Sequence, residues 1–165
     1  MDKQKKVTYP FKSNQLSGRW QTEIKQDNLI AILDLTLSKD GSSNIIVNAK
    51  MEGELQNGLF LKLPFVVTAN NGNWGLNASI LSLNYSEAIN DCFISNIEID
   101  GLEGEEKETK RNELQALFEQ NKSELISNMD LSKLLGTSEL IIQEVGAKEL
   151  KVTDGTNNIL FKKIE

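Results

Sequence analysis

The sequence contains no histidine, and this absence excludes several kinds of chemistry. Catalytic triads of the Ser-His-Asp type, histidine general bases and histidine metal sites all need an imidazole. Cys92 is the only cysteine, so the chain forms no internal disulfide and no cysteine-based zinc or iron–sulfur centre. Asp91 and Phe93 beside it supply no positive charge to activate the thiol. We therefore predict an inert, partly buried cysteine.

Long apolar runs are also missing. No stretch reaches the 18 or so residues of a membrane span, and the first 15 residues contain no apolar segment typical of a signal peptide. Residues 1–15 are therefore interpreted as a polar tail, and residues 16–165 as one domain. Two localisations fit this pattern: the cytosol, or the periplasm or envelope with an export signal already removed.

The composition is that of an ordinary folded domain. Of 165 residues, 39% are hydrophobic and 25% are charged, with a net charge of −6. Because phosphate binding needs clustered positive charge, this balance argues against nucleic acid as a partner. No phosphate-binding glycine loop, nucleophile elbow or metal-binding helix motif is found, and we expect no cofactor, no metal and no catalytic residue.

Two groups of carboxylates have alternative interpretations. The acidic string between Asp100 and Glu108 fits either a cation site or the start of a helix. It lacks the spacing of a calcium loop, and acidic residues stabilise helix N-termini, so the helix is favoured. Glu52 and Glu54 share one face of a predicted strand, and could pair as acid and base. Their face is the one opposite the apolar residues, which favours plain exposure to solvent.

The first hundred residues alternate between apolar and polar positions, as half-buried strands do. Asp40-Gly41 and Asn57-Gly58 are typical hairpin turns, for which we predict positive φ at both central positions, and Asn70-Asn71-Gly72 predicts a third turn. Pro64 cannot donate to a ladder and therefore predicts an edge or a bulge. The predicted strands are Leu16–Ile24, Leu29–Lys39, Asn44–Leu55, Leu59–Ala69, Asn73–Leu83 and a less regular one around Phe93–Ile99.

The second part of the chain begins with a helical pattern. Apolar residues recur at helical spacing and predict one amphipathic helix over about residues 104–129, interrupted only by Asn121, with a short turn at 130–135 after it. Its stripe consists of Leu114, Leu117, Phe118, Leu125 and Met129. Three strands then close the sequence: Glu139–Val145, Lys148–Thr153 and Asn158–Ile164.

This order predicts a mostly β fold, in which a single antiparallel meander of about eight strands closes into a barrel. Each strand has one apolar face, and one helix is too small to cover them all. Closing the sheet on itself buries these faces and removes exposed edges. The alternative is an open sheet with the helix on one face.

The string Leu16-Ser17-Gly18-Arg19-Trp20 resembles the Gly-x-Trp signature that opens the first strand of lipocalins and other calycin-type barrels. The chain as a whole is similar to bacterial lipocalin-like domains, many of them in envelope lipoproteins of unknown function. The resemblance implies that Trp20 closes one end of the barrel. Two features depart from the pattern: the helix precedes the last three strands, and the Thr-Asp-Tyr signature is absent.

We hypothesise a non-catalytic lipocalin-like domain that binds a small apolar ligand or acts in the bacterial cell envelope. The alternative is a protein-interaction domain with a filled barrel and an exposed apolar patch. In the first case the ligand would contact the inward-facing residues, namely Trp20, Leu33, Leu35, Val47, Phe65, Leu76 and Ile80.

Overall fold

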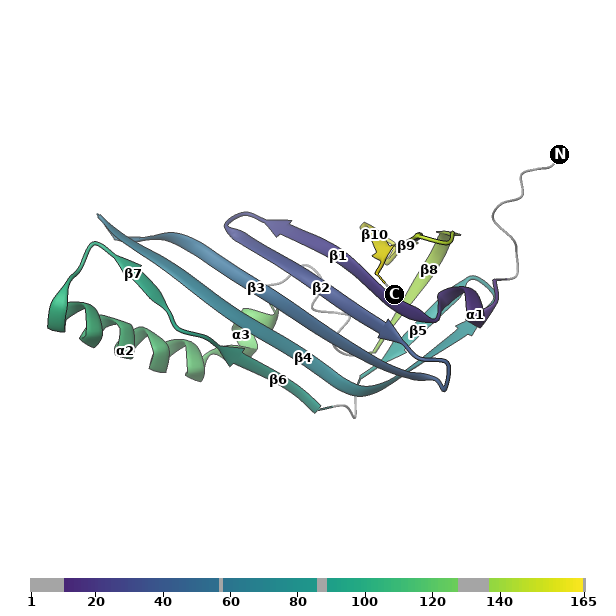
Figure 1. Ribbon diagram of the computed structural model, residues 1–165, viewed down its shortest axis with the longest axis horizontal. Helices are drawn as coiled ribbons and strands as arrows, with labels where there is room; N and C mark the ends of the chain where they lie inside the picture. The colour runs from purple at the N-terminus through teal and green to yellow at the C-terminus, as the bar shows by residue number, and fades with distance from the viewer. Residues whose placement is uncertain (1–10, 57, 86–88, 128–136, 165) are drawn as a thin grey trace.

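The structure is a computed structural model that describes residues 11–56, 58–85, 89–127 and 137–164 (Figure 1). Ten strands and three helices make up this part of the chain. In order they are α1 (Ser13–Leu16), β1 (Gly18–Gln26), β2 (Leu29–Leu37), β3 (Ser42–Gln56), β4 (Leu59–Asn77), β5 (Ile80–Asn84), β6 (Ile89–Ile94), β7 (Glu98–Asp100), α2 (Gly104–Gln120), α3 (Lys122–Ser127), β8 (Thr137–Val145), β9 (Glu149–Thr153) and β10 (Asn158–Lys163).

The sheet closes into an eight-stranded antiparallel barrel, as predicted. Its strands follow the order β1-β2-β3-β4-β5-β8-β9-β10, and β10 pairs with β1 to complete the ring. Apart from the closing pair β10–β1, neighbouring strands in this ring are neighbours in the chain except where β8 follows β5. The fold is therefore an up-and-down meander with one insertion.

The insertion consists of β6, β7, α2 and α3, and it attaches to the edge of β4. One edge of β4 pairs with β3 along most of its length. The other edge pairs in turn with β7 at 60–62, with β6 at 65–70 and with β5 at 73–77. The 19-residue strand β4 thus belongs both to the barrel and to a sheet that extends beyond it (Figure 1).

Strand alternation predicts the core correctly in β2 and in β4 as far as Ala69, but not around Leu76 and Ile80, which are partly exposed while Leu81 and Leu83 are buried. All five apolar residues on the inward face of β2 are buried, and their neighbours Ile30 and Ile32 are exposed. The inward face of β4 is buried in the same way from Leu59 to Ala69. These residues belong to one continuous apolar core.

Pro64, for which the sequence predicts an edge or a bulge, lies at a gap in the strands that pair with one edge of β4. Its carbonyl oxygen accepts a hydrogen bond from the Ser95 amide at 3.0 Å, so its nitrogen also faces the β6–β7 side. There the partner strand is interrupted, because β6 ends at Ile94 and β7 begins at Glu98. The absent N–H therefore removes no ladder hydrogen bond.

The turn after β2 forms where predicted but with a different geometry. Gly41 has a φ of 92°, whereas Asp40 is not among the described residues with positive φ. The amide of Ser38 donates to the carbonyl of Ser42 at 2.9 Å, and the amide of Gly41 donates to Ser38 at 3.0 Å. This is a three-residue loop with glycine in the left-handed position, rather than a type I′ turn.

Two predicted boundaries in β4 are wrong. The chain does not turn at Asn70-Asn71-Gly72, because β4 continues through these residues to Asn77. The reversal comes later, at Ala78, which adopts a φ of 57°. Consequently the predicted strand Asn73–Leu83 is divided into the end of β4 and the whole of β5.

The predicted helix is present before the last three strands, but it forms two pieces. Asn121 ends α2, and its side-chain amide caps the carbonyl of Leu117 at 2.8 Å. Leu114 is buried, Phe118 is partly buried and Leu117 is 49% exposed. The side chains of Leu125 and Met129 and the predicted turn at 130–135 lie outside the described residues.

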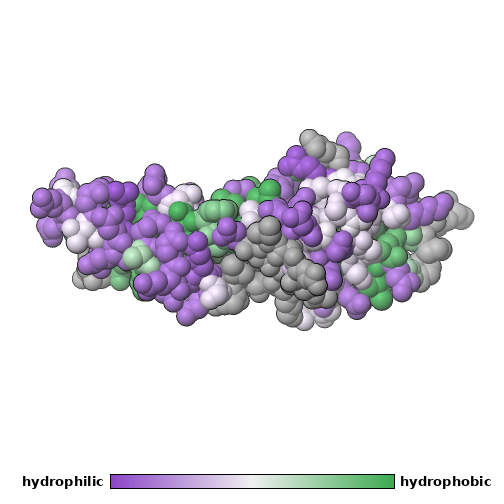
Figure 2. Space-filling view, turned by 90° about the horizontal axis from the view of Figure 1, so that it is seen from below, coloured by the Kyte–Doolittle hydropathy of each residue, from purple (hydrophilic) through white to green (hydrophobic). Residues whose placement is uncertain are grey.

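Helix α2 covers the inner face of the extended sheet, where it contacts β6 and β7. Its opposite side is hydrophilic, as Figure 2 shows at the left of the molecule. No helix in the described part of the chain has the length and hydropathy needed to cross a membrane.

The folded region begins before residue 16. Phe11, placed by the sequence in the polar tail, is only 7% exposed and belongs to the core. The short helix α1 follows it and buries Leu16 completely. The tail prediction missed both features because one aromatic residue among polar neighbours gives no periodic signal.

Candidate functional site

Most residues predicted to contact a ligand are packed into the barrel core. Trp20, Leu33, Leu35, Val47 and Phe65 are each between 0 and 1% exposed. Side chains buried to this degree do not line a water-filled cavity. Leu76 and Ile80 lie apart from them, near the hairpin that joins β4 to β5, and are partly exposed.

Trp20 lies at the start of β1 and is completely buried. Its indole nitrogen donates a hydrogen bond to the carbonyl of Leu16 at 2.7 Å, which ties β1 to α1. The ammonium of Lys163 in β10 lies 5.3 Å from the centre of the ring. The cation over the indole thus comes from the last strand, and not from the adjacent Arg19, because neighbouring residues of a strand point to opposite faces.

The buried hydroxyl groups of Ser43 and Tyr85 form the one polar contact within the described core between two side chains. Ser43 also donates to the carbonyl of Thr36 at 2.9 Å. Burial raises the pKa of Tyr85 to about 12, and the hydrogen bond between Tyr85 and Ser43 opposes part of this shift. The ring of Tyr85 lies directly against Gly72 of β4, so the pair is part of the packed core.

The ionisable groups in the described part of the chain offer no candidate metal centre. Among the described residues, no three cysteine and carboxylate side chains are placed to hold a metal ion. Glu52 is exposed and pairs with Lys50 at 3.1 Å on the outer face. Burial raises the pKa of the Cys92 thiol, with Lys122 opposing the shift. A thiol with a raised pKa is a poor nucleophile.

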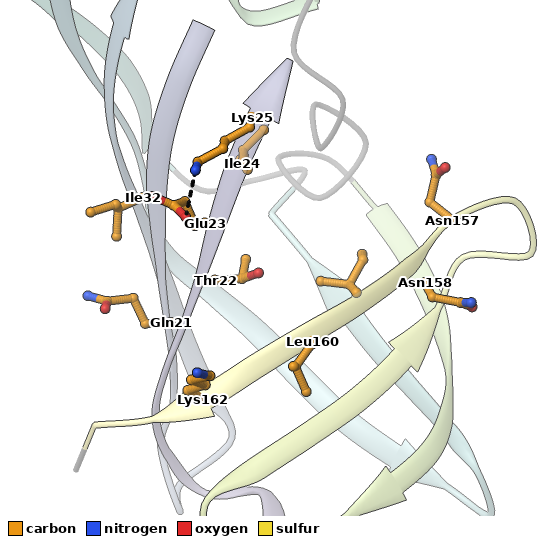
Figure 3. Close-up of a pocket in the computed structure, with 11 residues that line it drawn as sticks. Gln21, Thr22, Glu23, Ile24, Lys25, Ile32, Asn157, Asn158, Leu160 and Lys162 are labelled. Atoms are coloured by element: carbon orange, nitrogen blue, oxygen red, sulfur yellow. Dashed lines mark ion pairs between the residues drawn. The ribbon is translucent and has the colours of Figure 1, made fainter.

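A cleft lies between β1 and β10, where the barrel wall opens (Figure 3). The two strands are paired at Trp20 and Gln21 and then diverge. The cleft has a volume of about 680 Å³. Its lining combines inward residues such as Ile24 with the outward residues Glu23 and Lys25, whose charged groups are 3.9 Å apart. We call this cleft the seam.

A second surface lies on the outer face of β2, β3, β4 and β6, and we call it the outer patch. It consists of exposed or partly exposed apolar side chains that surround a shallow groove of about 320 Å³. Its members are Ile30, Ile32, Ile46, Pro64, Val66 and Phe93. Residues Ile32, Asn48, Val66 and Phe93 form one row across the four strands by direct pairing.

The outer patch was not predicted, although the sequence contains its signal. Ile30 and Ile32 occupy outward positions of the alternating β2 pattern, and Ile46 and Phe93 do the same in β3 and β6. Apolar residues in the polar phase of several strands indicate a surface that is kept apolar. Recognising that they meet requires the strand register, which the sequence does not specify. Comparisons with protein-family models, with curated proteins and with solved structures find no match to this chain.

Proposed function

We propose that the protein is a non-catalytic interaction module: a filled lipocalin-like barrel that binds a partner protein through the outer patch. The observation that carries the proposal is the row of apolar residues across β2, β4 and β6. Ile32 is 40% exposed and Phe93 is 56% exposed, with Val66 and the polar Asn48 of β3 between them. Strands lie about 4.8 Å apart, so the row extends over roughly 14 Å of surface.

The contrast between the two faces of the same strands supports this choice over a carrier for a small apolar ligand. On the inner face, Leu33 and Val47 are each 1% exposed. On the outer face, Ile30 is 50% exposed and Ile46 is 40% exposed. Apolar surface gathered on one outer face is typical of a surface that another protein covers.

Photo-crosslinking tests the outer patch directly. Benzoylphenylalanine is introduced in place of Phe93, and the full chain is expressed in its native host. The matched control carries the same group in place of Ile141, which is 49% exposed on β8 on another part of the barrel. We expect a discrete protein adduct from position 93 only. Equal labelling from both positions, or no adduct from position 93, would contradict the proposal.

Native mass spectrometry with solvent extraction tests the filled interior. A filled barrel predicts the mass of the polypeptide alone, 18.5 kDa, after gentle purification. A stoichiometric apolar molecule in the extract would instead support the carrier function, and would refute the filled barrel.

A further inference from the structure

The seam is the least paired junction in the barrel wall. On one side, β1 forms nine register pairs with β2, from Gly18 to Gln26. On the other side, its ladder with β10 has two, Trp20 with Lys163 and Gln21 with Lys162. One further hydrogen bond joins the Ile164 amide to the Arg19 carbonyl at 2.9 Å. The rest of β1, from Thr22 to Gln26, diverges from β10 (Figure 3).

Main-chain groups of both strands face this opening. The Arg19 carbonyl points toward β10, and alternate residues of an antiparallel strand point to the same side. The N–H and C=O groups of Glu23 and Lys25 therefore face the seam. By the same rule, Lys162 pairs with Gln21, so the main-chain groups of Leu160 also face it. No backbone hydrogen bond across the seam joins these residues in the part of the chain that the structure describes.

We propose that the seam binds an extended polypeptide segment of a partner protein, which pairs antiparallel with β1 at Glu23 and Lys25. A free strand edge presents donors and acceptors at the spacing of another strand, and it is therefore complementary to an extended backbone. The cleft of about 680 Å³ provides room beside the edge. This site is separate from the groove of the outer patch, although Ile32 lines both.

The side chains around the seam specify the pattern of the bound segment. Thr22, Ile24 and Ile159 face the inner side of the cleft and would contact apolar side chains of the segment. Glu23 and Lys162 are exposed on the outer side and would lie beside polar ones. Because successive side chains of a strand point to opposite faces, the segment would alternate apolar and polar residues.

Amide hydrogen exchange on the full chain tests whether the edge is free. We expect the amides of Glu23 and Lys25 to exchange at least a hundredfold faster than those of Thr22 and Ile24, which face β2. Equal protection of all four amides would mean that the seam is already closed, by another segment of this chain or by a second copy. Equal protection from either cause would overturn the proposal.

Binding is tested with peptides selected from a random dodecamer display library against the full chain. We expect the selected peptides to share an alternating pattern and to slow the exchange of the Glu23 and Lys25 amides. A synthetic copy of a selected peptide, N-methylated on the amides that would face β1, should bind at least tenfold more weakly than the unmethylated peptide. Failure to select any peptide, or equal binding of the methylated copy, would refute main-chain pairing.

Two variants separate backbone recognition from side-chain recognition. Lys25→Pro removes an amide from the free edge without removing a hydrogen bond to β2, and proline is tolerated on edges. Lys25→Ala removes the same side chain and keeps the amide. We expect at least a tenfold loss of affinity for the first variant and less than threefold for the second. Equal affinities would place the peptide elsewhere, and the exchange pattern of Lys25→Pro verifies that it folds.

Discussion

Substitution of Gly72 by alanine should destabilise the protein, mainly through the ring of Tyr85. A Cβ atom at this position would lie 2.2 Å from Cδ1 of Tyr85, 2.5 Å from Cε1 and 2.9 Å from the carbonyl oxygen of Asn84. The ring is completely buried and held by Ser43, so it has no free space to enter. Overpacking of this kind costs about 1–3 kcal/mol. For a domain of this size, that lowers the melting temperature by about 2–4 °C per kcal/mol.

Gly75 provides the matched control because it lies on the same strand and a Cβ there would meet nothing within 4 Å. Gly75→Ala should change the free energy of unfolding by no more than about 0.5 kcal/mol, or raise it slightly through the unfolded state. Urea denaturation followed by the fluorescence of Trp20 and Trp74 measures both variants.

A double-mutant cycle identifies Tyr85 as the cause. Tyr85→Ala removes the ring and should cost about 3–5 kcal/mol, as large aromatic truncations do. In that background, Gly72→Ala should cost clearly less than it does alone, and the cost that remains should come from the Asn84 carbonyl; the difference is the coupling, about 0.5–3 kcal/mol. If the two costs simply add, or if Gly72→Ala behaves like Gly75→Ala, the steric explanation is wrong.

Three further predictions follow from the core and the turns. Because burial raises the pKa of Tyr85 from 10.0 to about 12, the folded state holds this proton more tightly than the unfolded state. The free energy of unfolding should therefore be unaffected below pH 10 and fall by about 2–3 kcal/mol from pH 10 to 12. Urea titrations at each pH measure this fall, and Tyr85→Phe should remove it. Trp20→Ala should cost about 3–5 kcal/mol in the same assay, and a loss below about 1 kcal/mol would show that the indole does not hold the end of the barrel. Gly101→Ala should destabilise the protein by more than about 1 kcal/mol. Gly101 has a φ of 111°, and a Cβ added there would lie 2.1 Å from the carbonyl oxygen of Gly58. An unchanged unfolding midpoint would contradict this packing.

The barrel could be predicted because alternation and turn residues agree over most strands. The misplaced turn in β4 has a specific cause. Gly72 is required by the ring of Tyr85, and not by a chain reversal, so the usual meaning of an Asn-Gly pair does not apply. The true turn places Ala78 at a positive φ, where the sequence has no glycine to indicate it. In both cases tertiary contacts outweigh local preference.

The candidate surfaces were harder to predict than the fold. The seam depends on where β10 leaves β1, and this divergence follows from three-dimensional closure rather than from any residue pattern. The filled interior likewise depends on how the side chains of opposite strands meet. Alternation shows which residues point inward, but it does not distinguish a packed core from a ligand cavity.

The insertion pairs with a long edge of β4 that the eight-stranded barrel leaves open. Asn84, the last residue of β5, pairs directly with Thr137, the first residue of β8, so a short turn could join them in a smaller barrel. Such a protein would leave twelve residues of β4, Leu59 to Asn70, without a partner on one edge. Long unpaired edges recruit other chains into aggregates. By pairing with this edge of β4, the inserted strands β6 and β7 keep it from pairing with other chains.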